Sequence, residues 1–204
     1  MDEPRFLLVD GHGLAYRAFY ALPELTAPDG TPVNAVLGFL NMLQKVLEER
    51  RPEGWGLFFD PKGPTARKEM YDAYKEGRRP TPEAFKVQLL LLLELLEALG
   101  HRVTLRSGVE ADDGIAATAS ALAAEGDVLV LSADKDLLQV LAPGFRVCRP
   151  QKVVSEFRIY DEALFREEYG FAPQAVADYL ALTGDSVDHI PGVPGIGDKG
   201  ARGL

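Results

Sequence analysis

Short apolar runs alternate along the chain with longer segments in which apolar residues recur at helical spacing. Five of the short runs are rich in Val, Leu and Phe, which is typical of buried strands. They lie at residues 6–9, 55–59, 102–105, 127–131 and 145–148. Strands that alternate with helices are typical of a parallel sheet with helices on both faces. The pattern therefore predicts an α/β fold with a mostly parallel central sheet.

Start and stop signals predict helices between and after these strands, at about residues 31–51, 81–99, 161–170 and 173–182. The first two begin with Thr-Pro, so we expect Thr31 and Thr81 to be N-caps, each with proline at the first helical position. Beyond residue 183 the chain becomes rich in Gly, Pro and Asp. No internal repeat or linker interrupts the pattern, so we expect residues 1–204 to form a single domain.

The composition indicates what kind of protein this is and in which compartment it works. A chain of 204 residues with 47% apolar content can bury a substantial core without a disulfide or structural metal. The lone Cys148 has no partner for an intrachain bridge, which suits a reducing compartment. Residues 1–9 lack the basic and long apolar parts of a signal peptide, and the leucine-rich stretch at 87–99 is too short to span a bilayer. We therefore expect a cytoplasmic protein that does not enter the membrane.

The acidic net charge of the chain bears on whether nucleic acid can be its partner. There are 31 acidic and 22 basic side chains, so the formal charge is −9. Phosphate backbones are bound by basic surfaces, so this total by itself argues against a nucleic-acid partner.

Carboxylates follow the predicted strands at their C-terminal ends, where open α/β sheets bind ligands. Individually each has an ordinary explanation, because Asp10 and Asp60 can act in turns or as helix caps, and acidic residues near 110 can stabilise a helix N-terminus. The full set, which also includes two residues after the last predicted helix, is Asp10, Asp60, Glu110, Asp112, Asp113, Asp134, Asp136, Asp185 and Asp188.

Nine carboxylates at one edge of a sheet would repel one another, so we expect cations among them. All-oxygen ligands favour hard ions, and nine are too many for a single Mg²⁺. The sequence therefore predicts two Mg²⁺ or Mn²⁺ ions that act together on a phosphodiester. The three histidines, His12, His101 and His189, are scattered along the chain, and we expect none of them to be catalytic.

Residues 61–86 reverse the local sign of the charge, with seven basic and four acidic side chains. Tyr71 and Tyr74 are interleaved with them, so the segment can offer phosphate contacts and a surface on which an unpaired base stacks. An ordinary solvated helical hairpin is the alternative interpretation.

A glycine- and proline-rich turn at 190–197 precedes Asp198 and Lys199. Glycines such as Gly192, Gly195 and Gly197 let backbone N–H groups approach a phosphate without reading base sequence. We expect this turn to contact a phosphate group.

Five motifs in this order resemble those of the flap endonuclease-like 5′-nucleases, and more narrowly of the bacterial 5′-3′ exonucleases such as the N-terminal domain of DNA polymerase I. They are Val9-Asp10-Gly11, Phe59-Asp60, Glu110-Ala111-Asp112-Asp113, Asp134-Lys135-Asp136, and Gly184-Asp185-Ser186-Val187-Asp188 followed by the glycine- and proline-rich turn.

The resemblance implies roles for particular residues. The nine carboxylates match the metal ligands of the family, and Lys75, Arg78 and Asp113 are expected to be catalytic. Tyr74, Lys75 and Arg78 match a helical arch, here 61–86, through which a single-stranded 5′ end passes. A DNA-contacting role is expected of Tyr16, Arg17, Arg67, Tyr74, Lys75, Arg78, Arg79, Gly192, Gly195, Gly197 and Lys199.

The resemblance also divides the domain. Residues 1–182 match the catalytic core, and 183–204 match the start of a helix-three-turn-helix element that grips duplex DNA with help from K⁺. Family domains continue beyond this point, so we expect a truncated or reduced clamp.

The implied activity is structure-specific hydrolysis of DNA near single-strand/double-strand junctions, in replication and repair. The expected partners are DNA with a 5′ flap or 5′ end and a fused or separate polymerase, and we expect a monomer. Two alternatives remain open at this point: a non-catalytic module that binds branched DNA, and a PIN-like ribonuclease or phosphatase that uses the same acids.

Overall fold

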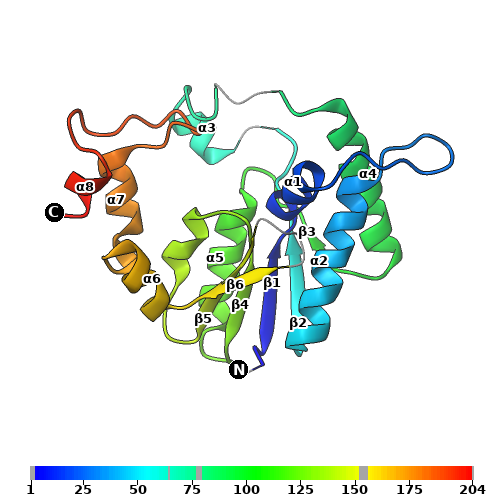
Figure 1. Cartoon of the computed structure of the whole chain (residues 1–204), viewed down its shortest axis with the longest axis horizontal. Coiled ribbons are helices and arrows are strands. Elements are labelled where there is room, and N and C mark those ends of the chain that lie inside the picture. Colours follow the sequence, from blue (N-terminus) through cyan, green and yellow to red (C-terminus); the bar gives the residue numbers. More distant parts are fainter. Residues whose placement is uncertain (1–2, 64, 77–79, 152–155, 204) are drawn as a thin grey trace.

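A six-stranded sheet forms the centre of the protein, with strand order β3-β2-β1-β4-β5-β6 (Figure 1). The computed structural model describes residues 3–63, 65–76, 80–151 and 156–203. Among the strands that the structure describes, β5 and β6 pair antiparallel and the other neighbours pair parallel. The strands are β1 (Phe6–Asp10), β2 (Gly54–Phe58), β3 (Val103–Thr104), β4 (Val128–Leu131), β5 (Phe145–Pro150) and β6 (Phe157–Tyr160). The predicted α/β class with a mostly parallel sheet is confirmed.

All five predicted apolar runs form strands, although the third is only two residues long. The sixth strand, β6, was not predicted, because Phe157 and Ile159 alternate with Arg158 and form too short a pattern to stand out.

Helices cover both faces of the sheet, since consecutive strand residues join different cores. Val9 and Leu57 pack in one core with α1 (Gly11–Ala21), α2 (Asn34–Arg50) and α4 (Glu83–Ala98). Leu8 and Phe58 pack in the other, with α5 (Ala111–Leu122) and α6 (Glu162–Tyr169). The remaining elements are α3 (Ala66–Met70), α7 (Val176–Thr183), α8 (Asp198–Ala201) and the short 3₁₀ helices η1 (Asp136–Val140) and η2 (Pro173–Ala175).

The predicted N-caps of two helices were wrong. Helix α2 begins at Asn34 after Val33, because Thr31 belongs to a turn in which its backbone N–H donates to Asp29 Oδ1. Helix α4 begins at Glu83, with Pro82 rather than Thr81 at the N-cap. The hydroxyl of Thr81 instead accepts a hydrogen bond from Tyr16 at 3.0 Å. In contrast, Asp161 caps α6 as predicted, and its side chain accepts from Leu164 N at 2.8 Å.

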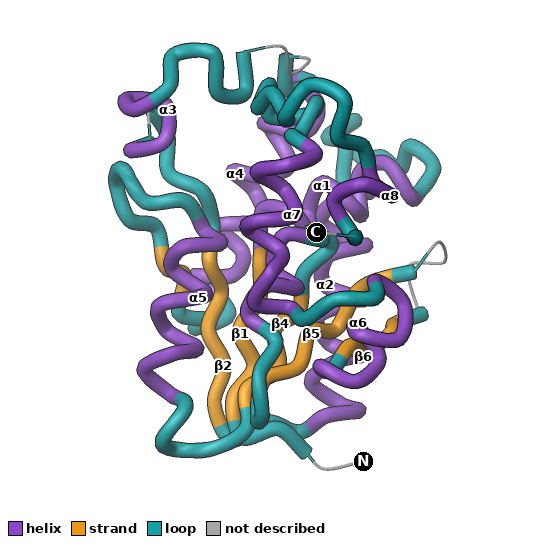
Figure 2. The backbone as a smooth tube through the Cα atoms, turned by 90° about the vertical axis from the view of Figure 1, so that its left-hand side faces the viewer, coloured by secondary structure: helices purple, strands orange, loops and turns teal. Residues whose placement is uncertain are grey.

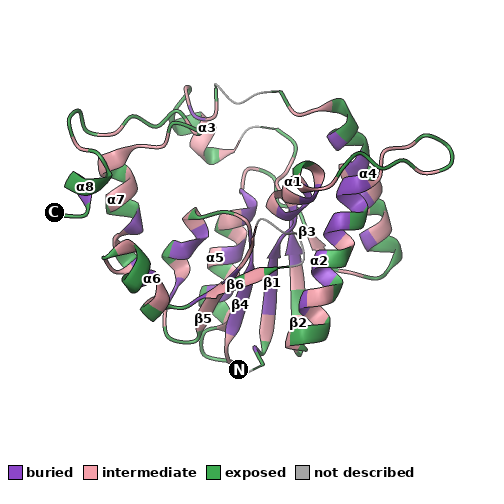
Figure 3. Cartoon of the chain, in the orientation of Figure 1, coloured by how far each residue is buried: buried purple, intermediate pink, exposed green. Residues whose placement is uncertain are grey.

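The C-terminal ends of the parallel strands share one edge of the sheet, and α3 lies beyond that edge (Figure 2). The N-terminal ends of these strands lie at the opposite edge. The central strands are largely buried, whereas the segments beyond the C-terminal edge are mostly half-buried or exposed (Figure 3). Among the described residues, no helix combines the length and apolar character needed to cross a membrane.

Candidate functional site

Asp10 ends the buried central strand β1 and begins the site. It is 8% exposed, and its carboxylate caps α1 by accepting from Gly13 N at 2.8 Å. The other carboxylate oxygen accepts from the hydroxyl of Ser132 at 2.7 Å. Gly13 is required here, because a Cβ at that position would lie 2.2 Å from Asp10 Oδ2. The strand-to-helix turn therefore fixes the direction of the Asp10 side chain.

Helix α5 places the next group of carboxylates beside Asp10. Asp60 follows β2, and its side chain accepts from Ala111 N at 2.8 Å, at the first residue of α5. Glu110 occupies the N-cap position and is 5% exposed. Asp112 and Asp113 lie in the first turn of the helix, where the macrodipole favours negative charge. These carboxylates therefore stabilise the N-terminus of α5 and also lie together near Asp10.

The turn after β4 supplies Asp134 and Asp136. Asp134 Oδ1 accepts from Asp136 N at 2.9 Å, and Asp134 N donates to Ser132 Oγ at 2.9 Å. Lys135 lies between them and forms an ion pair with Asp185 at 3.6 Å. This pair links the turn to the segment that follows α7.

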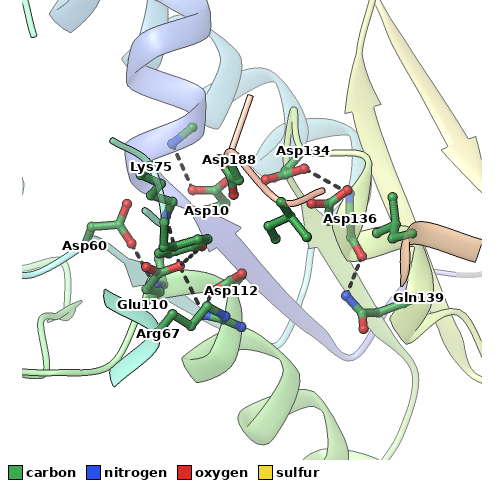
Figure 4. Close-up of a pocket in the computed structure, with 15 residues that line it drawn as sticks. Asp10, Asp60, Arg67, Lys75, Glu110, Asp112, Asp134, Asp136, Gln139 and Asp188 are labelled. Atoms are coloured by element: carbon green, nitrogen blue, oxygen red, sulfur yellow. Dashed lines mark hydrogen bonds and ion pairs between the residues drawn. The ribbon is translucent and has the colours of Figure 1, made fainter. Parts of the chain in front are cut away.

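Seven of the nine predicted carboxylates line one pocket at the C-terminal edge of the sheet (Figure 4). They are Asp10, Asp60, Glu110, Asp112, Asp134, Asp136 and Asp188. The other two lie outside its lining. Asp113 is exposed and bound to Arg67, while Asp185 closes its own turn by accepting from Val187 N at 2.8 Å.

Two basic side chains from the segment after β2 lie among these acids and supply part of the expected positive charge. Arg67 donates to Glu110 Oε2 at 3.0 Å and to both oxygens of Asp113 at 2.7 Å. Lys75 Nζ donates to Glu110 Oε2 at 3.0 Å. Both side chains also line the pocket, so residues predicted to contact DNA here neutralise carboxylates.

Burial and neighbouring positive charges shift the pKa values of the pocket carboxyl groups in opposite directions. Burial raises the pKa of Asp10 to about 6, against the hydrogen bonds from Ser132 and Gly13. Burial and the nearby charge of Asp134 likewise raise the pKa of Asp136 to about 6. Burial would also raise the pKa of Glu110, but hydrogen bonds from Lys75 and Thr65 outweigh it and hold the pKa below its usual range. The negative charge near Asp10 and Asp136 is therefore the less compensated part of the site.

This side of the pocket offers carboxylate oxygens, which are the type of donor that hard cations prefer. Oδ1 of Asp136 is buried and has no hydrogen-bond partner in the described ranges. Within those same ranges, however, no three His, Cys, Asp or Glu side chains are gathered closely enough to hold a metal ion as they stand. Arg67 and Lys75 both donate to Glu110 Oε2, so this carboxylate is paired with basic side chains.

The segment that carries Lys75 also contacts the turn after α7. Lys75 N donates to Asp188 O at 3.1 Å, and the hydroxyl of Tyr71 donates to His189 O at 3.3 Å. Tyr74 is only 7% exposed and donates its hydroxyl to Glu110 at 3.1 Å. Of the two tyrosines proposed for base stacking, Tyr71 is therefore exposed and Tyr74 is part of the pocket wall. Arg78 and Arg79 lie outside the described residues.

Tyr16 and Arg17 both lie on α1. The ring of Tyr16 stacks on Phe85 with centroids 4.0 Å apart. Arg17 donates to the backbone oxygen of Gln151, beyond the end of β5. Neither residue lines the acidic pocket.

The turn at 190–197 gives its glycines different roles. A Cβ on Gly192 would lie 2.4 Å from the carbonyl carbon of Thr183, so this glycine permits close packing of the backbone. Gly195 has a φ of 86°, and Gly197 precedes α8. Lys199 lies on α8 and is exposed. The predicted phosphate-contacting residues are thus on the surface, except for the half-buried Gly192.

Sequence reasoning missed several residues that line the pocket or hold its carboxylates by hydrogen bonds. Ser132 is fully buried between Asp10 and Asp134. Thr65 donates its hydroxyl to Glu110 at 2.8 Å, and Gln139 lines the pocket. A polar Ser132 directly after a continuous apolar strand was the signal that could have drawn attention to it.

Comparison with known families gives two adjoining matches. Residues 5–170 match the model of the 5′-3′ exonuclease N-terminal resolvase-like domain. Residues 171–204 match the model of the 5′-3′ exonuclease C-terminal SAM fold.

Two curated relatives illustrate the similarity in sequence. The chain is 47% identical over 201 residues to the thermostable DNA polymerase I of Thermus aquaticus. The aligned residues cover 98% of this chain and 23% of the relative. The chain is 41% identical over 200 residues to DNA polymerase I of Bacillus caldotenax, again covering 98% and 23%. The chain therefore spans about a quarter of the length of these relatives.

Solved structures show the same fold at lower identity. A phage T5 5′-exonuclease with bound zinc matches with a TM-score of 0.77 and 20% identity, over 97% of this chain and 73% of that one. The catalytic core of Rad2 in complex with a DNA substrate matches with a TM-score of 0.61 and 18% identity, over 98% and 60%.

Proposed function

The chain belongs to the 5′-3′ exonuclease family, and from that premise we propose that it is a divalent-metal-dependent, structure-specific 5′-nuclease. Its substrate would be DNA with a 5′ flap or a 5′ end at a single-strand/double-strand junction. The observation that carries this proposal is the pocket in which seven carboxylates meet Arg67 and Lys75 at the C-terminal edge of the sheet. Carboxylates can hold cations, and the neighbouring basic side chains can bind phosphate. This combination suits the hydrolysis of a phosphodiester.

The pocket acids would hold two Mg²⁺ or Mn²⁺ ions, with Asp113 and Asp185 at its margin. Oxygen ligands favour these hard ions, and the unpartnered Oδ1 of Asp136 supports such a role. When bound, the cations supply Lewis acidity and positive charge at the scissile phosphate. Support also comes from a relative, since the phage T5 5′-exonuclease has been solved with divalent metal ions.

The basic side chains of the pocket would move from carboxylates to phosphate oxygens when the substrate enters. Lys75 now neutralises Glu110 at 3.0 Å, and it lies within the pocket that the substrate phosphate would share. Cations that take over the carboxylates would leave Lys75 and Arg67 available for phosphate oxygens. With Arg78, they would hold the DNA backbone and stabilise charge that develops on the phosphate.

The proposal extends to the whole chain and its setting. Residues 1–204 would act as one monomeric domain, in which 1–182 form the catalytic core and 183–204 contact duplex DNA through the turn at 190–197. K⁺ would assist at that turn. A polymerase is the expected partner, because the relatives are DNA polymerases, and the cytoplasm is the expected location.

The decisive experiment is cleavage of a labelled 5′-flap DNA in Mg²⁺, with EDTA as the first control. Asp134→Asn should lower the rate at least about 100-fold, since it removes a charge that the cations need. The matched control is Glu94→Gln, the same carboxylate-to-amide change at an exposed position of α4. It should cleave like the wild type.

The outcomes separate the alternatives. Cleavage that persists in EDTA and in Asp134→Asn would overturn the metal-dependent mechanism. Flap binding without turnover in any divalent metal would indicate a branched-DNA-binding module. Faster hydrolysis of RNA or of small phosphoesters than of flap DNA would indicate a ribonuclease or phosphatase.

A further inference from the structure

Ser132 is the one buried hydroxyl that joins two carboxylate-bearing segments of the pocket within the described residues. It follows the last residue of β4 and has no exposed surface. Its backbone N–H donates to Cys148 O at 3.1 Å, which extends the pairing between β4 and β5 by one residue. The sheet therefore holds the backbone of Ser132, which fixes the position from which its side chain extends.

The hydroxyl of Ser132 makes two different hydrogen bonds. It donates to Asp10 Oδ2 at 2.7 Å and accepts from Asp134 N at 2.9 Å. Asp134 Oδ1 in turn accepts from Asp136 N at 2.9 Å. A continuous chain of hydrogen bonds therefore runs from β1 through Ser132 to the first residue of η1, and it passes through three carboxylate residues.

Each oxygen of the Asp10 carboxylate accepts one hydrogen bond from the described residues. Gly13 N holds Oδ1 at 2.8 Å, and Ser132 holds Oδ2. Without the hydroxyl, Oδ2 would be buried without this donor and the carboxylate could turn about its bond to Cβ. The N–H of Asp134 would lose its acceptor in the same step, so two pocket carboxylates would lose their mutual placement.

We propose that Ser132 is a positioning residue that sets the divalent-cation affinity of the pocket by fixing Asp10 relative to the Asp134–Asp136 turn. The inference rests on the proposed function, because it assumes that these carboxylates bind the cations. Groups that orient metal ligands commonly change affinity by 10- to 100-fold when they are removed. A hydroxyl that served only to end β4 would have no such effect on metal binding.

The test is Mg²⁺ and Mn²⁺ binding by isothermal titration calorimetry, without DNA. Ser132→Ala should weaken affinity by about 10- to 100-fold. Ser132→Thr, which keeps the hydroxyl, should stay within about threefold of the wild type. Ser120→Ala is the matched control, since that hydroxyl donates only to Ala116 O at 2.9 Å on the surface of α5. It should bind both cations like the wild type.

Thermal melting in EDTA verifies that each variant is folded. If Ser132→Ala does not fold, Ser132→Cys keeps a weaker donor of similar shape and should show an intermediate loss of affinity. A folded Ser132→Ala or Ser132→Cys with wild-type affinity would overturn the inference alone. A wild-type protein that binds neither cation would overturn the proposed function and this inference with it.

Discussion

Arg67 holds Asp113 through two parallel hydrogen bonds, Nη1 to Oδ2 and Nη2 to Oδ1, each 2.7 Å long. Nη1 also donates to Glu110 Oε2 at 3.0 Å. Bidentate pairs of this kind are among the stronger hydrogen bonds of proteins. Arg67 therefore neutralises part of the negative charge of the carboxylates.

Removal of Arg67 should change metal affinity and stability in opposite directions. Arg67→Met frees Glu110 and Asp113 from a competing cation, so Mn²⁺ should bind roughly threefold to tenfold more tightly, or about 0.7 to 1.4 kcal/mol. The same variant should melt at a lower temperature in EDTA, because Glu110 stays buried with fewer partners. Calorimetric titration and melting curves measure the two effects.

Lys68→Met is the control for that prediction. Lys68 lies on the same short helix, but its ammonium group donates to the backbone oxygen of Asp72. Metal affinity should not change in this variant. Weaker Mn²⁺ binding in Arg67→Met than in the wild type would show that Arg67 supports the site.

Asp10→Asn should stabilise the metal-free protein at high pH. Burial raises the pKa of Asp10 to about 6 from 3.8, so above pH 6 the folded state carries an ionised group that the unfolded state carries at lower cost. The variant should therefore gain up to about 3 kcal/mol at pH 8, and the gain should shrink as pH falls from 6 towards 4. Urea unfolding in EDTA at pH 8 and pH 4.5 measures the difference. A gain that is equal at both pH values would refute the assignment to ionisation.

Gly13→Ala should damage the site through sterics alone. The new Cβ would lie 2.2 Å from Asp10 Oδ2, so the carboxylate must leave its position between Gly13 and Ser132. We expect a loss of about 1 to 3 kcal/mol in stability together with much weaker metal binding. Gly200→Ala is the control, because its Cβ would meet only Ile196 Cγ2 at 3.6 Å. Unchanged metal binding in Gly13→Ala would contradict the described geometry.

Cys148 should be inert in the native protein. It is a core residue of β5 and is 1% exposed, and burial raises the pKa of its thiol to about 12. The thiolate needed for attack is therefore scarce at neutral pH. A thiol reagent should label it only after denaturation in urea, and labelling within the mixing time under native conditions would contradict the buried placement.

The sequence predicted those parts of the fold that local patterns determine. Continuous apolar runs predicted β1, β2 and β4, and the carboxylates at their ends predicted the pocket, because a parallel sheet brings such ends together. The pattern failed where tertiary contacts override local preference. Thr31 resembles an N-cap in sequence, yet a turn closed by Asp29 takes its backbone N–H.

The partners within the pocket could not be predicted in the same way. Arg67 and Glu110 are 43 residues apart, and Ser132 and Asp10 are 122 apart, so no local pattern links them. The charge of residues 61–86 predicts attraction to phosphate, and the family resemblance singled out Arg67 and Lys75 within this segment. Their choice of carboxylate partners in the protein depends on packing that only the structure shows.

The strand order has a consequence for how the site forms during folding. Strand β1 lies between β2 and β4, so the pocket combines residues from position 10 to position 188 that meet only when the central sheet is complete. Pairings of such high sequence separation form late and slowly. A partly folded chain would thus lack the assembled acids. Cation binding at the pocket would therefore report the completion of folding.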